Sequence, residues 1–238
     1  MPYILKPAKL IEVPSFEVAT VPPGRLVSHH QWQRIVEVYR LLALSMLVTV
    51  TAGLAINTAL PNGAAAIVFL TAFALFPILG LTMPSAKGTG NWFAFRFFSL
   101  CVVEGCVIGP ILKFSERSAP GLSALVGLTS LVVAVSLVAY AFFSRLNYSR
   151  WFGFIVCSAI VILVTSVIGN SMKGTLVETA CDAGMLLVIC GAILYDSSKL
   201  LEPGRNQTPV EDASDIHADV TCFFFTLFNL LSRLVTKT

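Results

Sequence analysis

Charge is scarce in this sequence. Only 12% of the 238 residues are Asp, Glu, Lys or Arg, whereas 56% are hydrophobic; a soluble domain has about 25% charged residues. An ordinary water-soluble domain is therefore excluded. The net charge is only +3, and the basic residues are scattered and form no stripe, so nucleic acid is not an expected partner.

Motifs of hydrolases and metal sites are also missing. The sequence contains no Gly-x-Ser-x-Gly, no His-Glu-x-x-His and no Cys-x-x-Cys, and it has only 3 His residues. The 6 Cys residues lie in or beside apolar runs, where Cys behaves as a small hydrophobe. We therefore expect no enzyme activity, no cofactor and no structural metal.

Long apolar runs make up most of the chain. A membrane-spanning helix needs about 20 apolar residues, and seven runs come near this length. They predict an all-α polytopic membrane protein, in which a cytosolic segment over residues 1–37 precedes a single transmembrane domain over 38–235. The runs are 38–60, 64–83, 92–112, 120–143, 151–168, 175–195 and 219–235.

Lys and Arg predict the orientation, because cytoplasmic loops retain positive charge. With a cytosolic N-terminus, most of the basic residues lie in the N-terminal segment and in the loops of the cytosolic side, among them Lys6, Arg34, Arg145 and Lys199. We therefore expect an N-terminus in the cytosol. Seven spans then place the C-terminus on the opposite side, whereas loss or re-entry of the last run would return it to the cytosol.

Acidic residues at membrane depth are the first candidates for function. A charged side chain there costs at least about 2.5 kcal/mol. Glu104 lies 12 positions after Trp92, or about 18 Å along a helix, so we place it near the middle of the membrane. It is either a neutral acid bonded to a neighbouring helix or a part of an ion path. Asp182 is a lesser candidate, because interfacial solvation explains it adequately.

Two further carboxyl groups lie at neighbouring helix ends. Asp196 ends the sixth run and Asp219 begins the seventh, so both ends reach the same side of the membrane. Either both side chains face water, or they meet and share a proton, because like charges in contact cannot both ionise. Such a pair is a pH-dependent clasp, and its oxygens suit a hard cation when it opens. Arg96, at the same level, either balances these acids or reaches the headgroups.

Several motifs, in order, resemble one family. The third run contains Glu104 to Leu112 (EGCVIGPIL), the sixth ends with Ile193 to Glu202 (ILYDSSKLLE), the fifth ends with Ile168-Gly169-Asn170, and a basic stretch over 140–150 separates the fourth and fifth. Together they are similar to the Bax inhibitor-1 family, also called the transmembrane Bax inhibitor motif or lifeguard family, over residues 30–235.

The resemblance implies six helices around a seventh and residence in the endoplasmic reticulum or another internal membrane. Members suppress cell death and let calcium leak in a pH-dependent way through two Asp residues, on helices six and seven. Asp196 matches the first Asp. Asp215 and His217 match the start of the second motif, but a Phe occupies the expected Asp position. Asp219, one turn earlier, is the candidate substitute, and such departures suit a divergent or virus-encoded member.

Two functions stay open. In the first, the chain is a pH-sensitive calcium leak channel that lowers store calcium and inhibits apoptosis, with Ca²⁺ and protons as ligands. In the second, it is a non-conducting adaptor that protects cells through apoptosis-regulating membrane proteins. Calcium flux through the purified chain separates the two.

Overall fold

The described residues form seven helices. The computed structural model describes residues 29–81, 90–144, 148, 151–171, 175–202 and 207–235, so the first 28 residues of the predicted cytosolic segment and most of the predicted basic stretch near 145–150 lie outside the described residues. No strand occurs in the described part. The helices are α1 (His29–Ala59), α2 (Asn62–Leu81), α3 (Gly90–Ser118), α4 (Leu122–Ser144), α5 (Phe152–Ser171), α6 (Thr175–Lys199) and α7 (Pro209–Val235).

Each predicted span corresponds to one helix, but two helices begin much earlier than their apolar runs. Helix α1 begins at His29 instead of residue 38, and α7 begins at Pro209 instead of residue 219. Thr208 and Glu211 form a capping box before α7, with the Thr208 N–H donating to Glu211 at 2.6 Å and the Glu211 N–H donating to the Thr208 hydroxyl at 3.3 Å. Hydropathy alone misses such a start, because polar residues begin this helix.

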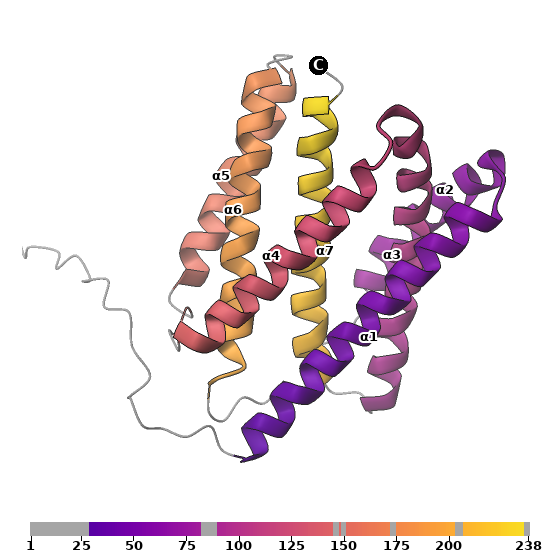
Figure 1. Ribbon diagram of the computed structural model, residues 1–238. Coiled ribbons are helices and arrows are strands. Elements are labelled where there is room, and N and C mark those ends of the chain that lie inside the picture. Colours follow the sequence, from indigo (N-terminus) through magenta and orange to yellow (C-terminus); the bar gives the residue numbers. More distant parts are fainter. Residues whose placement is uncertain are drawn as a thin grey trace, which may run out of the picture.

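Helix α7 lies in the middle of the bundle (Figure 1). It packs against α1, α3, α4 and α6, whereas α2 packs on α3 and α5 packs on α6. Thus α2 and α5 support the central helix through their neighbours. Helix α1 and helix α7 begin at the same end of the bundle, which we call the N-end; α7 finishes at the opposite C-end.

Two apolar cores flank α7. One joins α1, α3 and α7 around Val38, Phe97 and Ile216, and the other joins α4, α6 and α7 around Val126, Ile193 and Phe223. The first core contains Ala213 and Ile216 of α7 and the second contains Phe223, Leu227 and Phe228, so the two cores follow one another along this helix.

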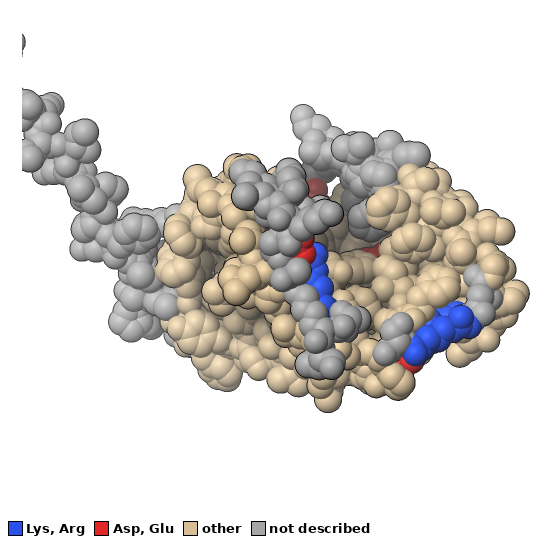
Figure 2. Space-filling view, turned by 90° about the horizontal axis from the view of Figure 1, so that it is seen from above, with Lys and Arg blue, Asp and Glu red and all other residues tan. Residues whose placement is uncertain are grey.

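The outer surface is apolar, as a bilayer requires. Large side chains such as Leu70 on α2, Leu128 on α4 and Val161 on α5 are more than half exposed. Five helices (α1, α3, α4, α6 and α7) are long and apolar enough to cross a membrane, and the described parts of α2 and α5 form shorter apolar helices. Seen from the C-end, charged atoms occupy only small parts of the described surface (Figure 2). The chain is a polytopic helical membrane protein.

Glycines let α1 and α3 approach closely. A Cβ added at Gly105 would overlap the Thr49 carbonyl oxygen and lie 2.6 Å from the Ala52 Cβ, and one added at Gly109 would lie 2.5 Å from the Gly53 carbonyl oxygen. Only hydrogen fits at these two positions. Small residues at such contacts let helices pack without a hydrophobic driving force.

We expect Gly105→Ala to lower stability by about 1–3 kcal/mol, because the new methyl group overpacks the contact between α1 and α3. Thermal unfolding in detergent measures the effect. Gly127→Ala on α4 is the matched control, since a Cβ there meets nothing within 4 Å and Ala favours a helix by about 1 kcal/mol over Gly. Equal melting temperatures for the two variants would contradict this packing.

Candidate functional site

Asp196 and Asp219 meet at the N-end of the bundle. Asp196 lies in the last turn of α6, and its carboxyl group is near enough to that of Asp219 on α7 to interact with it. The Lys199 ammonium group donates to Asp196 Oδ1 at 2.8 Å and lies 3.8 Å from the centre of the Tyr195 ring. Asp219 Oδ2 is buried and has no hydrogen-bond partner among the described residues. Two neighbouring carboxyl groups oppose each other's ionisation, and the Lys199 charge partly offsets theirs.

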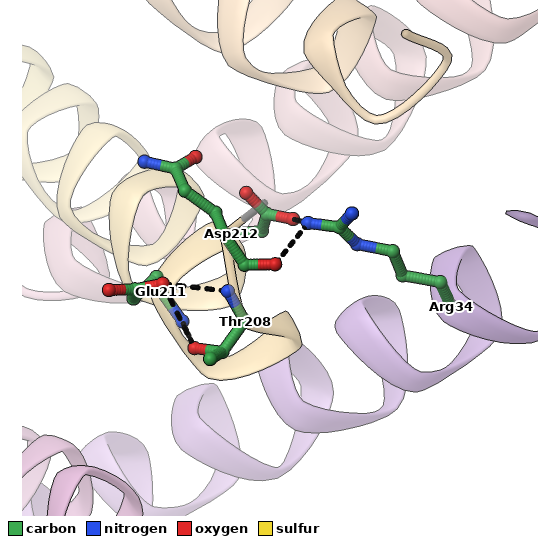
Figure 3. Close-up of polar contacts among 5 residues, drawn as sticks. Arg34, Thr208, Glu211 and Asp212 are labelled. Carbon is green, nitrogen blue, oxygen red and sulfur yellow. Dashed lines mark hydrogen bonds and ion pairs between the residues drawn. The ribbon is translucent and has the colours of Figure 1, made fainter. Parts of the chain in front are cut away.

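The first turn of α7 is fastened to α1 by an ion pair. Arg34 Nη2 donates to Asp212 Oδ2 at 2.7 Å and to the Gln207 carbonyl oxygen at 2.5 Å (Figure 3). The Asp212 side chain is fully buried, whereas that of Arg34 is 22% exposed. The capping box of Thr208 and Glu211 lies beside this pair and places Asp212 where Arg34 reaches it.

A second acidic contact lies on another side of α7. Glu104 Oε2 of α3 lies 2.6 Å from His217 Nε2 of α7, and His217 Nδ1 lies 2.8 Å from the Ser45 hydroxyl of α1. The Phe97 ring packs edge-on against the imidazole. Glu104, His217 and Ser45 are all at most 4% exposed, so this polar chain is sealed from solvent.

The C-end carries a third group of charges. Arg233 of α7 donates to Glu178 at 2.6 Å and lies 3.6 Å from Asp182, both on α6. Asp182 also lines a cavity of about 200 Å³ between α5, α6 and α7, together with Thr226 and Asn229. Asp182 is therefore far along the membrane from the pair of Asp196 and Asp219.

The structure separates the predicted candidates into three places. Asp196 and Asp219 form one pair, with Asp215 within electrostatic range of Asp219. Glu104 and His217 form another, and Asp182 belongs to the C-end. Arg96, the predicted counter-charge, lies 5.9 Å from the centre of the Trp92 ring, and no ion pair joins it to an acid among the described residues.

Sequence reasoning missed Arg34, Asp212, Ser45 and Arg233. The signal for Asp212 was present, since Thr208-Pro209-Val210-Glu211 is a capping-box sequence that places Asp212 inside a helix. Ser45 carries no such signal, because a hydroxyl residue within an apolar run usually bonds its own backbone. Ser45 does this too, donating to the Leu42 carbonyl oxygen at 2.8 Å.

We expect Arg34→Met to destabilise the fold by about 3 kcal/mol, because it leaves the buried Asp212 carboxylate without its partner. Arg40→Met is the matched control, since Arg40 lies on the same helix with an exposed side chain. Unfolding of both variants in the same detergent gives the comparison. Equal stabilities would show that this ion pair does not fasten α7 to α1.

Comparison with known proteins agrees with this architecture. An uncharacterized membrane protein of Vibrio cholerae serotype O1 (strain ATCC 39315 / El Tor Inaba N16961) is 25% identical over 197 residues, which cover 81% of this chain and 86% of that protein. The family described as "Inhibitor of apoptosis-promoting Bax1" matches residues 31–234. This match confirms the resemblance to the Bax inhibitor-1 family and covers all seven helices. The chain is a multi-pass membrane protein that belongs to this family.

Proposed function

We propose that the chain is a pH-sensitive calcium leak channel of an internal membrane, and that it inhibits apoptosis by lowering the calcium content of the store. The contact between Asp196 and Asp219 carries this proposal. In this proposal, a proton shared by the two carboxyl groups holds α6 on α7. Membership of the family supports the anti-apoptotic role.

The proton decides whether the last turn of α6 stays in contact with α7. With a shared proton, the two carboxyl groups attract each other. Without it, two negative charges lie in contact in a poorly hydrated place and repel. Lys199 offsets one of the two charges, since it contacts Asp196. Loss of the proton therefore favours separation of α7 from the last turn of α6.

The separated carboxylates are suitable ligands for calcium. Ca²⁺ prefers oxygen ligands and accepts carboxylates in flexible arrangements. Asp219 Oδ2 is buried and has no hydrogen-bond partner among the described residues, so a cation would displace no protein contact there. We place this pair on the cytosolic side of the endoplasmic reticulum or another internal membrane, because the distribution of Lys and Arg favours a cytosolic N-terminus.

The test is calcium efflux from liposomes that contain the purified chain, at one acidic and one alkaline pH. We expect several-fold faster efflux at alkaline pH, where the pair loses its proton. Asp196→Asn combined with Asp219→Asn should abolish this pH dependence, because two amides hold a hydrogen bond but do not titrate. Glu37→Gln is the matched control, since it removes an exposed carboxylate near the N-end of α1 and should leave the pH profile unchanged.

The outcomes are distinct. Efflux that stays absent at both pH values would refute the channel. In that case, the adaptor function makes two predictions. The Asp196→Asn variant still protects cells from death, and a membrane protein co-purifies with the chain. If efflux keeps its pH dependence in the double variant, the chain is still a channel, but the pair of Asp196 and Asp219 is not its pH sensor.

A further inference from the structure

The hydrogen bonds around His217 define where its protons are. The Ser45 hydroxyl has one hydrogen, and it donates this hydrogen to the Leu42 carbonyl oxygen at 2.8 Å. A carbonyl oxygen only accepts. With this hydrogen on Leu42, the Ser45 oxygen accepts from His217 Nδ1, at 2.8 Å, and Nδ1 carries a proton; the proposal below rests on this assignment.

The other ring nitrogen faces a carboxyl group. His217 Nε2 and Glu104 Oε2 are 2.6 Å apart, which is a hydrogen-bond distance and requires one proton between them. If this proton belongs to the ring, an imidazolium faces a carboxylate; if it belongs to Glu104, a neutral ring faces a neutral acid. The summed charge of the two residues is zero in both cases.

We propose that Ser45, His217 and Glu104 form a binding site for a single exchangeable proton, which joins α1, α3 and α7 without net charge inside the membrane. This site is separate from the pair of Asp196 and Asp219, because it uses other residues and two other helices. It exists whether or not the chain conducts calcium. Glu104, in this arrangement, is held by His217 and is not an open ligand for a cation.

Among the described residues, no charge around the site competes for Glu104. On α3, Cys101 Sγ lies 3.7 Å from His217 Nε2, and on α7 the Cys222 thiol lies within electrostatic range of both Glu104 and Asp219. Helix α4 has no charged residue. On α1, Arg34 is bound to Asp212, and on α6, Asp196 is bound to Lys199.

Electrical neutrality explains why such a deep site is tolerated. An uncompensated carboxylate in the membrane costs several kcal/mol, whereas a carboxyl group that shares a proton with imidazole brings no net charge. Both ring nitrogens of His217 also have a hydrogen-bond partner, Ser45 and Glu104, so neither is left buried and unsatisfied.

¹⁵N NMR of His217 in a variant without the other two histidines tests the proposal directly. The chain has only 3 His, so His29→Gln with His30→Gln leaves ¹⁵N-labelled His217 alone, with its site unchanged. We expect Nδ1 to appear as a protonated nitrogen near neutral pH and Nε2 to show a strong hydrogen bond. An unprotonated Nδ1 would overturn the proposal.

Two substitutions then identify the partner of Nε2. In Glu104→Gln, the amide N–H donates to the ring, so Nδ1 should keep its proton while Nε2 becomes an unprotonated acceptor. Cys101→Ala is the matched control one turn away on α3, and it should leave both resonances in place. If Cys101→Ala changes Nε2 and Glu104→Gln does not, the proton belongs to the thiol and the proposed site is refuted.

Discussion

The fold depends on how the polar groups of α7 are neutralised. This helix runs through the middle of the bundle, yet it carries acids, a histidine and an arginine in a molecule whose outer surface is apolar. Four of these groups are met from another helix: Asp212 by Arg34 of α1, His217 by Glu104 of α3, Asp219 by Asp196 of α6, and Arg233 by Glu178 of α6. A bilayer makes this matching obligatory, because an unmatched charge there is expensive.

The four contacts differ in what holds them. The pairs of Arg34 with Asp212 and of Arg233 with Glu178 join fixed opposite charges, so they persist over a wide pH range. The contacts at His217 and at Asp219 each need a proton between two groups. Fixed ion pairs thus anchor α7 near both of its ends, and the two proton-dependent contacts lie between these anchors. A change of pH acts on the inner contacts and leaves the anchors in place.

The apolar runs predicted the seven helices because the hydropathy of a segment depends only on its own residues. They missed the starts of α1 and α7, because these starts are polar. The meeting of Asp196 with Asp219 could be anticipated, since consecutive helices bring their adjoining ends to the same side of the membrane. The contact of Glu104 with His217 could not, because 113 positions separate the two residues and only the packing of α3 on α7 joins them. Arg96 is the reverse case. Its level in the membrane suggested that it balances Asp196 and Asp219, yet its guanidinium lies 5.9 Å from the centre of the Trp92 ring on its own helix.

The geometry of α7 also bears on which helix moves in the proposed channel. His217 and Asp219 are two residues apart, which turns them about 200° around the helix axis, so they face different neighbours. His217 belongs to the side of α1 and α3, whose backbones are locked together at Gly105 and Gly109. Asp219 faces α6, which carries α5 on its other side. Moving α7 away from α6 would strain the contact of His217 with Glu104 and that of Asp212 with Arg34. Moving the last turns of α6 instead breaks only the contact between the two Asp residues and the local packing of α6. The arrangement therefore favours α6 as the moving helix and α7, held by α1 and α3, as the fixed one.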